Sequence, residues 1–548
     1  MFNSSTKLFL VFGAFILCNY SFTQTITISG NVKDIITNSP IEGAKVELKE
    51  LNSGTIDSVF TDFSGNWNYQ FLISAISSEV GIPGTFLVYQ NFPNPFNPST
   101  KINFSVPAAE NISITVHNIL GELIDQKSIT LNPGNYIIDW FSKGSAGVYF
   151  YTISFGNQSQ TKKMIQLDGG NGIGLGDIHQ TNSNLSISKN NFAALPVKIV
   201  IKKLGYAADT INTNITGGEY ISTNLQTVHS KYTLIDLHND VLEVMIDDPS
   251  YHLKDLHSYN HTDIPRLVMG GVDVQFFSIW VSPTAYTNYY DQAIAMRDLF
   301  YTEISANPTT ISQATTMQQA LDINSQGKIA AVIGVEGGHH IENSLDKLYT
   351  LYNSGMRYLT ITWNNSTDWA IAASDSTTLT DGLTEFGRQV IRKLDSLGVI
   401  IDVSHVGIKT IQDILEVTQN PIIASHSGVR ALRNSTRNLY DWQIQDIAKS
   451  GGVIGIVFYP PFLVSPTPAY ISDVINHIDY IVNLVGVDYV AIGSDFDGIG
   501  TNVVKGLEDV TKFPDLTLAL LQHGYTELEV AKFLGGNFKR VFEQVCKQ

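Results

Sequence analysis

The chain has 548 residues, which is too long for one ordinary domain and indicates about two to four. Its apolar content of 43% is enough for large buried cores, while only 16% of its residues are charged. A net charge of −17 argues against a nucleic-acid-binding protein, because such proteins present basic surfaces, and it fits ordinary solubility.

Residues 1–24 have the pattern of a secretory signal peptide. Lys7 precedes the apolar run Leu8–Leu17, and polar residues follow, with cleavage expected near Gln24. The apolar run is too short for a membrane span, and no later stretch is long enough. We therefore expect an exported protein, extracellular or attached to the cell surface. After cleavage Cys546 is the single cysteine, so no intrachain disulfide is expected.

Residues 25–80 alternate apolar and polar positions in short runs separated by turn residues, which predicts an antiparallel β domain. The apolar positions of these runs are Ile26, Ile28, Val46, Leu48, Trp67 and Tyr69. With Val46 and Leu48 facing inward, the intervening lysines and glutamate face solvent. The stretches GNVKD, PIEGAKV and TDFSGNW resemble carboxypeptidase regulatory-like β-sandwich domains.

A proline-rich stretch, QNFPNPFNPST from Gln90 to Thr100, predicts an extended loop without strands. Alternating strands follow, so residues 84–168 are expected to form an Ig-like β module. The stretch resembles the start of the small Ig-like modules that serve as sorting or attachment tails on secreted bacterial proteins. Those modules usually lie at the C-terminus, whereas this one lies inside the chain, which favours a structural or adhesive β module.

Residues 169–189 are rich in Gly, Asn and Ser, a composition that predicts a linker. Strand-like texture returns over residues 190–228. Because the first β domain has few strands of its own, we expect these later strands to complete its sandwich, with the Ig-like module inserted between the two halves.

From residue 229 to 548, eight strand-like apolar runs alternate with segments of helical spacing. The runs are Leu234–Leu237, Val272–Trp280, Ile329–Val335, Tyr358–Thr362, Val399–Val403, Ile422–Ala424, Val453–Phe458 and Tyr489–Ile492. This alternation predicts a TIM-type (β/α)8 barrel, so the whole chain is expected to be multidomain, with all-β modules before an α/β barrel.

Metal-binding side chains cluster just past these runs, where such barrels hold their chemistry. The residues are His238, Asp240, Glu336, His405, His426 and Asp495. His238 and Asp240 are two residues apart, a spacing that points both the same way at the end of a strand. So many charges at one barrel mouth are costly unless a cation neutralises them, and imidazole with carboxylate suits zinc.

These residues belong to motifs that resemble the membrane dipeptidase (renal dipeptidase) family, peptidase family M19. The motifs are DLHND, HTDIPRL, GGVDVQFFS, IGVEGGHHIENSL, GMRYLTIT, DVSH, ASHS, TRN and IGSDFDG, in order over residues 231–546. The resemblance implies a barrel with two zinc ions that hydrolyses dipeptides through a metal-bridging hydroxide. It implies that His238, Asp240 and Glu336 hold one ion, and that Glu336 bridges to a second, completed by His405 and His426.

By the same resemblance, Asp495 is the catalytic acid and base, beside the catalytic and metal-bridging Glu336. Arg437 is the arginine that pairs with the substrate's terminal carboxylate, a task suited to a bidentate guanidinium. Tyr459 aligns with a substrate-binding tyrosine, and a core aromatic is the alternative. His339 and His340, near Glu336, include at least one residue that supports a ligand or the structure.

Trp363 departs from the family pattern, because the dipeptidases carry a histidine there that helps to bind the carbonyl or the developing oxyanion. Indole is only a donor and cannot titrate, so Trp363 either contacts substrate differently or forms a wall of the pocket. Three functions stay open: a secreted zinc dipeptidase, a related metal-dependent amidohydrolase acting on D-residue or modified dipeptides, and a non-catalytic surface protein. The expected partner is a dipeptide, with no nucleic acid and no membrane span; a homodimer is one expected assembly.

Overall fold

The computed structural model describes residues 21–76, 84–181, 194–376 and 381–547. The predicted signal segment lies outside these residues except for its last four, which begin β1 (Ser21–Asp34). The chain divides into two compact units: the first contains residues 1–29, 68–196 and 214–219, and the second contains residues 30–67, 197–213 and 220–548.

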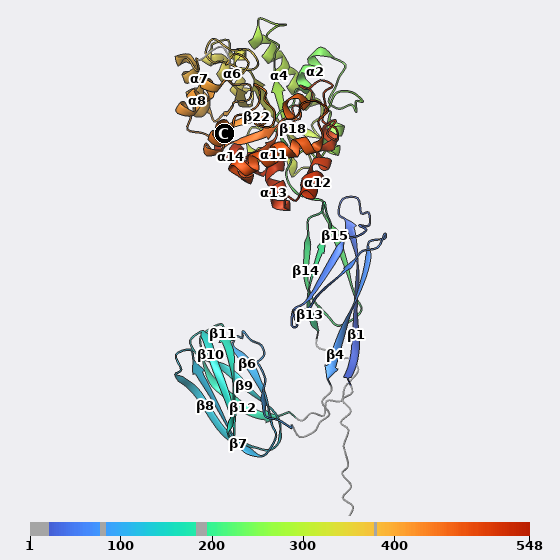
Figure 1. Ribbon diagram of the computed structural model, residues 1–548, viewed down its shortest axis with the longest axis vertical. Coiled ribbons are helices and arrows are strands. Elements are labelled where there is room, and N and C mark those ends of the chain that lie inside the picture. Colours follow the sequence, from blue (N-terminus) through green and yellow to red (C-terminus); the bar gives the residue numbers. More distant parts are fainter. Residues whose placement is uncertain (1–20, 77–83, 182–193, 377–380, 548) are drawn as a thin grey trace, which may run out of the picture. The chain divides into compact units, whose positions relative to one another are not determined.

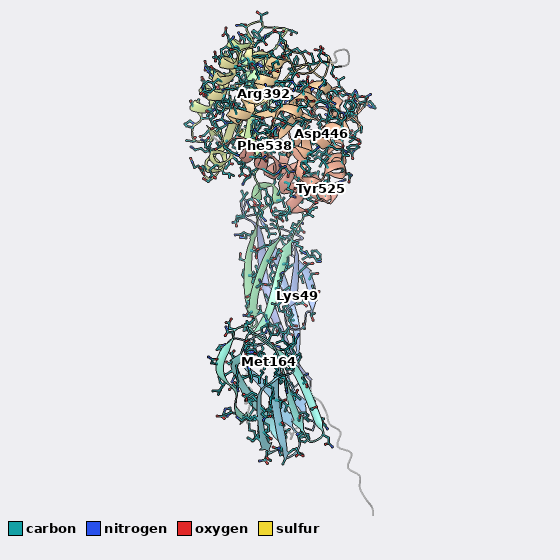
Figure 2. The ribbon with its side chains drawn as sticks, turned by 90° about the vertical axis from the view of Figure 1, so that its left-hand side faces the viewer. Lys49, Met164, Arg392, Asp446, Tyr525 and Phe538 are labelled. Carbon is teal, nitrogen blue, oxygen red and sulfur yellow. The ribbon has the colours of Figure 1, made fainter. Side chains whose placement is uncertain are left out.

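The inserted module, residues 84–181, is a pair of antiparallel sheets with strand orders β11-β10-β7-β8 and β12-β9-β6-β5. Its strands are β5 (Leu87–Val88), β6 (Ser99–Val106), β7 (Glu110–Asn118), β8 (Leu123–Leu131), β9 (Gly134–Gly144), β10 (Gly147–Phe155), β11 (Gln158–Gln166) and β12 (Gly170–Gln180). Alternate residues of β7, Ile112, Ile114 and Val116, are buried and pack in one core with Met164, which Figure 2 labels. The alternating apolar residues predicted from the sequence are therefore the ones that face the core of this module.

The proline-rich loop of this module forms no strand over residues 89–98, as its three prolines predict, and β6 begins at Ser99. The buried hydroxyl of Tyr151 fixes the loop. It donates to the carbonyl of Tyr89 and accepts from the backbone N–H of Asn91, each at 2.8 Å. The Tyr151 side chain thus supplies hydrogen-bond partners for two backbone groups of the loop that have none in a strand.

The linker predicted over 169–189 is wrong for its first part, because residues 170–180 form β12, which pairs with β9. The glycines serve close approach rather than flexibility. A Cβ added at Gly170 would lie 2.6 Å from the carbonyl oxygen of Ser142, and one at Gly172 would lie 2.7 Å from it. Residues 182–193 of the predicted linker lie outside the described part of the chain.

The strands on either side of the inserted module pair with one another in two sheets, ordered β15-β1-β4 and β14-β13-β2-β3. Besides β1 they are β2 (Lys45–Glu50), β3 (Ile56–Phe60), β4 (Asn66–Ile76), β13 (Leu195–Lys202), β14 (Asp209–Ile215) and β15 (Glu219–Leu225). β13 lies antiparallel to β2, with Ile199 opposite Leu48. Both residues are buried, so the predicted inward face of β2 meets an equally apolar face of β13.

The remaining strands form a closed barrel of eight parallel strands, because β17 pairs with both β16 and β19 and the last strand, β24, returns to β16. The strands are β16 (Ile235–Asp236), β17 (Val274–Ile279), β19 (Ile329–Glu336), β20 (Met356–Thr360), β21 (Ile400–Asp402), β22 (Ile422–Ser427), β23 (Val453–Ile456) and β24 (Val490–Ile492), with β18 (Ile311–Gln313) added beside the start of β19. Each predicted apolar run contributes one barrel strand, which confirms the predicted fold class.

Helices surround the barrel (Figure 1). They are α1 (Val228–Lys231), α2 (Val241–Asp247), α3 (Ile264–Met269), α4 (Tyr289–Ala306), α5 (Met317–Asn324), α6 (Leu345–Asn353), α7 (Glu385–Leu397), α8 (Ile408–Val417), α9 (Asp441–Lys449), α10 (Pro460–Leu463), α11 (Ile471–Val485), α12 (Phe513–His523), α13 (Glu527–Ala531) and α14 (Asn537–Val545), with the shorter turns η1 (Gly338–Ile341), η2 (Val487–Tyr489), η3 (Val510–Lys512) and η4 (Lys532–Gly536). None of the helices in the described ranges has the length and apolarity needed to cross a membrane.

The barrel interior is filled by side chains rather than open. Alternate strand residues such as Val274 and Phe276 pack in one cluster with α14. The ring of Phe276 lies 5.2 Å from that of Phe538, which Figure 2 labels. Cys546, just past α14, is buried with its sulfur 3.7 Å from the carbonyl of Arg357 in β20. This packing leaves the carboxyl ends of the strands free to carry a site.

Candidate metal centre

The six side chains predicted at the strand ends converge at the carboxyl end of the barrel. Their ligand atoms form three sets, each with all atoms within 4.8 Å of one another. The sets are His238 with Asp240 and Glu336, Glu336 with His405 and His426, and His238 with His426 and Asp495. Strand register produces this convergence, since Glu336 ends β19, His426 lies in β22, and the others follow β16, β21 and β24 within a few residues.

Glu336 lies between two groups of ligands and directs one oxygen toward each. Its Oε1 is 2.9 Å from Nε2 of His405 and 3.4 Å from Nε2 of His426. Its Oε2 is 3.6 Å from Nε2 of His238, which in turn is 3.2 Å from Asp240. Burial disfavours the charged carboxylate, but the surrounding imidazoles outweigh it and hold the pKa of Glu336 well below its ordinary value.

Each of the three histidines has its Nδ1 held by a neighbour. The partners are the hydroxyl of Tyr358 at 2.7 Å for His238, Oδ1 of Asn364 at 2.9 Å for His405, and the hydroxyl of Ser425 at 2.9 Å for His426. When Nδ1–H is donated to these oxygens, the lone pair of each Nε2 faces the centre. The sequence reasoning missed all three partners.

Two buried aspartates fix the loops that carry candidate site residues. Asp236 of β16 accepts the backbone N–H of Ser494 at 2.8 Å and its hydroxyl at 2.7 Å. Asp402 of β21 accepts the backbone N–H of Ser425 at 2.7 Å and its hydroxyl at 2.6 Å. Each serine immediately precedes a candidate site residue. Burial raises the pKa of Asp236 to about 6 despite these hydrogen bonds.

Unusual backbone conformations occur at two of the site residues. His405 has φ of 67° and Asp495 has φ of 62°, in the left-handed region that side chains rarely adopt. Such conformations persist only where the surrounding structure enforces them, and they concentrate at functional sites. Burial, reinforced by the Asp240 and Glu336 carboxylates, raises the pKa of Asp495 well above its usual range.

A cavity of about 310 Å³ opens onto the centre. Its lining residues are Asp240, Glu243, Trp280, Glu336, Trp363, Asn364, His405, Arg437, Tyr459, Phe462, Asp495 and Gly498. The three predicted substrate-binding residues, Arg437, Tyr459 and Trp363, are therefore in it. Burial lowers the pKa of Arg437 to about 10, and two of its buried nitrogens, Nε and Nη1, have no partner among the described residues.

The walls of the cavity include residues that the sequence did not single out. Trp363 packs against Trp280, with ring centroids 4.9 Å apart, and its ring is 6.1 Å from His405. Glu243, one turn after Asp240 on α2, lines the cavity too. Burial, together with the nearby Asp240 carboxylate, raises the pKa of Glu243 to about 8. In the sequence, Glu243 is marked only as the one acidic residue in the apolar stretch from Val241 to Ile246.

His339 and His340, which follow Glu336, belong to none of the ligand sets found in the described residues. Nε2 of His339 is hydrogen-bonded to the carbonyl of Val281 at 3.0 Å, and Nδ1 of His340 to the carbonyl of Gly337. Both are buried. Both imidazoles are thus held by backbone carbonyls, which fits the supporting role expected for at least one of them.

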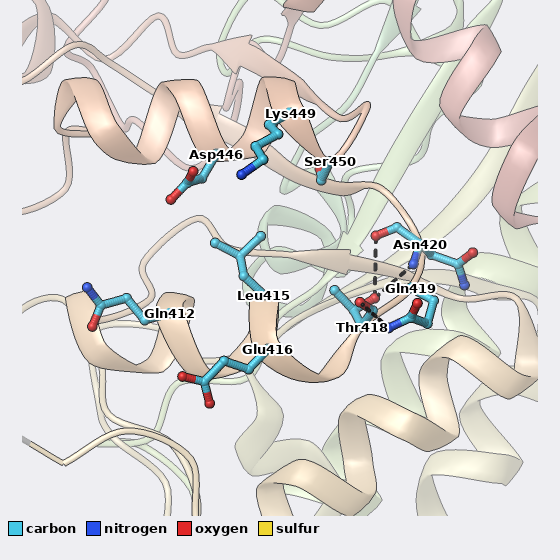
Figure 3. A pocket seen from close by; sticks show the side chains of 9 residues that line it. All are labelled: Gln412, Leu415, Glu416, Thr418, Gln419, Asn420, Asp446, Lys449 and Ser450. Carbon is cyan, nitrogen blue, oxygen red and sulfur yellow. Dashed lines mark hydrogen bonds between the residues drawn. The ribbon is translucent and has the colours of Figure 1, made fainter.

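A separate hollow of about 550 Å³ lies between α8 and α9 (Figure 3). It is lined by Gln412, Leu415, Glu416, Thr418, Gln419, Asn420, Asp446, Lys449 and Ser450. Figure 3 shows these side chains spread widely around it, and none belongs to the ligand sets above. The convergent chemistry is in the smaller cavity at the strand ends.

Comparisons with known proteins agree with this geometry. Residues 222–548 match the Membrane dipeptidase family (Peptidase family M19), and residues 90–166 match the Secretion system C-terminal sorting domain. Dipeptidase 3 of Homo sapiens is 34% identical over 331 residues, covering 59% of this chain and 67% of that protein.

Two crystal structures resemble the barrel part of the chain. The dipeptidase AC, a metallopeptidase, is 28% identical with a TM-score of 0.54, covering 58% of this chain and 99% of its own. A metallopeptidase from Rhodobacter sphaeroides, liganded with a phosphinate mimic of the dipeptide L-Ala-D-Ala, is 27% identical with a TM-score of 0.54, covering 57% and 99%. The family match spans more than half of the chain and includes every residue of the candidate centre, so this chain belongs to the membrane dipeptidase family, peptidase family M19, and is a metallo-dipeptidase.

Proposed function

We propose that the barrel is a two-zinc dipeptidase in which Glu336 bridges two ions. The observation that carries this is the division of its carboxylate, with Oε1 toward His405 and His426 and Oε2 toward His238. His238 and Asp240 with Glu336 would hold one ion, and His405 and His426 with Glu336 the other.

The residues present fit such a metal pair. Nε2 of His238 and Oδ1 of Asp240 are buried without a hydrogen-bond partner in the described chain, which is costly unless something occupies the centre. Imidazole nitrogens and carboxylate oxygens are the donors that zinc takes at catalytic sites. When bound, the two ions supply Lewis-acid activation of a water nucleophile and of the peptide carbonyl.

The protein's own groups would then orient the substrate and move protons. Asp495, whose Oδ1 is 3.9 Å from Nε2 of His238, would take the proton of the attacking water and return it to the leaving amine. Arg437 would pair with the free carboxylate of the dipeptide through its unpartnered N–H groups. Tyr459 and Trp363 would form substrate-contacting walls.

Metal analysis combined with a dipeptide panel tests this proposal. The purified protein should hold about two zinc ions per chain and hydrolyse dipeptides, and chelation should abolish the activity. Glu336→Gln should remove both the activity and most of the metal. The exposed Glu385→Gln on α7, the same chemical change outside the site, is the matched control. Unchanged hydrolysis in Glu336→Gln would overturn the proposal, and so would a purified protein that holds no metal.

A preference for D-residue or modified dipeptides is the second candidate, and Trp363 favours it. It stands at a position where the resemblance expects histidine, and it packs on Trp280 in the cavity. One related structure was liganded with a mimic of L-Ala-D-Ala, so L,L and L,D pairs belong in the panel with N-acyl amino acids. If Trp363→His shifts the L,L to L,D ratio, Trp363 sets stereochemical preference; an unchanged ratio assigns it to the wall alone.

We also propose that the protein is exported and attached at the cell surface through its inserted module, because residues 90–166 match a sorting domain. In intact cells of the source organism, the dipeptidase should be accessible to an added protease. Deleting residues 84–181 should release it from the cell fraction. Protection from protease in intact cells would contradict export.

A further inference from the structure

We propose that Glu243 forms a subsite that selects dipeptides whose first residue carries a basic side chain. This inference rests on the proposed dipeptide hydrolysis and adds a substrate class to it. Glu243 lines the cavity of the metal centre and also a neighbouring side pocket of about 240 Å³. Trp280 lines both as well, so the two residues stand at the junction of the two spaces.

Glu243 is a carboxylate without a partner. Its side chain takes no hydrogen bond and no ion pair from the described residues, although it is only partly exposed. Its partly buried carboxyl group keeps only part of its hydration, at a cost in free energy. A cation delivered into the cavity would remove that cost, whereas a neutral or anionic group would leave it in place.

The side pocket has the lining that a long basic side chain needs. Its lining combines the acidic Glu243 and Asp247 with apolar and aromatic residues such as Ile246, Met296, Trp280 and Tyr286, and contains no basic residue. The apolar members can cover the aliphatic stem of a lysine or arginine. Glu243 and Asp247, one helical turn apart on α2, can receive its charged head, and the aromatic rings add cation–π attraction.

The position of Arg437 decides which residue of the dipeptide enters this pocket. Arg437 donates to the carbonyl of His426, one of the residues proposed to hold the second ion. It would bind the terminal carboxylate of the dipeptide there. Glu243 lies on α2 just after Asp240, which is proposed to hold the first ion together with His238. A basic side chain on the C-terminal residue would lie beside the guanidinium and be repelled. The first residue carries its side chain away from that charge.

Kinetics with matched dipeptides test the inference. Lys-Ala should be hydrolysed with a higher kcat/KM than norleucyl-Ala, which has the same stem without the ammonium. Glu243→Gln should lower the Lys-Ala to norleucyl-Ala ratio by about 10- to 100-fold, the value of a hydrogen-bonded charge pair. Glu243→Lys should invert the preference toward Glu-Ala. Asp291→Asn, an exposed acid on α4 outside both cavities, is the matched control and should leave the ratio unchanged.

The outcomes separate this inference from the function on which it rests. If Ala-Ala and the other dipeptides are not hydrolysed at all, the proposed function fails. If Ala-Ala is hydrolysed but Lys-Ala is no better than norleucyl-Ala, or the ratio survives in Glu243→Gln, only the Glu243 subsite is overturned. A preference for Ala-Lys over Ala-norleucine without one for Lys-Ala would also overturn it.

Discussion

The hydroxyl oxygen of Tyr358 lies 2.7 Å from Nδ1 of His238, inside the barrel. Tyr358 comes from β20 and His238 follows β16, so the contact joins parts of the chain 120 residues apart. The ring of Tyr358 lies over Gly334, where an added Cβ would be 2.1 Å from it. The glycine therefore leaves the room that the tyrosine needs to reach the histidine.

Tyr358→Phe should weaken metal binding while keeping the fold, because it removes only the oxygen that accepts Nδ1–H. The expected loss of zinc affinity is about 10- to 100-fold, measured by competition with a chelator. Tyr301→Phe, which removes a hydroxyl bonded to the carbonyl of Ser354 outside the centre, is the control. Equal zinc affinities in the two variants would show that Tyr358 has no part in positioning His238.

Arg437→Lys should reduce kcat/KM for dipeptides by about 10- to 100-fold, because an ammonium cannot replace a bidentate guanidinium at a carboxylate. Dipeptide amides, which lack that carboxylate, should be poor substrates for both proteins. Their kcat/KM should therefore fall little further in Arg437→Lys. The comparison variant is Arg433→Lys, whose Nε donates to the carbonyl of Pro461 and which lies outside the cavity. A loss that is equal for dipeptides and their amides would contradict the assigned role.

Asp495→Asn should lower kcat by about 10²- to 10⁴-fold, the usual effect of losing a proton-transfer group. Its metal content should be measured alongside, because Asp495 lies close to His238 and His426. A kcat within a few fold of the original, with metal retained, would assign the proton transfer to another group.

Asp273→Asn should change how stability depends on pH. Burial raises the pKa of Asp273 from 3.8 to about 6, and its carboxylate accepts the backbone N–H of Leu234. The folded state therefore holds this proton more tightly than the unfolded state. The associated stability is present below pH 4 and is lost as the pH rises to about 6, an effect on the order of 2–3 kcal/mol.

The amide of Asp273→Asn can still accept from Leu234 but cannot ionise. The variant should therefore gain stability relative to the original protein between pH 4 and 7. Denaturant unfolding of the full chain at several pH values measures the difference. A difference that is constant across this range would mean that Asp273 ionises equally in both states.

The barrel and the convergence of its candidate ligands were predictable because both follow from local sequence patterns. Runs such as Ile329–Val335 are apolar on both faces, as buried parallel strands must be, and Glu336 follows directly. A residue just past such a run lies at the carboxyl end of the barrel whatever the loops do. Convergence of the six side chains follows from closure of the sheet, without knowledge of any individual contact.

Contacts made across the barrel could not be read in this way. Tyr358 looks like any core aromatic until β20 is placed near His238, and Asn364 looks like a loop residue until His405 lies beside it. The glycines of β12 give this segment the composition of a linker, because composition does not distinguish a free glycine from one that packs against Ser142. The place of Glu243 between two cavities depends on the packing of α2 against the barrel and has no local sequence pattern.

The hydrogen bonds from Ser494 to Asp236 tie the loop after the last barrel strand to the first strand. The candidate ligand His238 and its neighbour Asp495 are brought together where that seam closes. A chain that lacks its final strand would lack this tie between Ser494 and Asp236, and the end of the first strand, which carries His238 and Asp240, would lose that support. A metal bound at the proposed centre should therefore stabilise the closed seam, because a ligand that binds only the folded state stabilises that state.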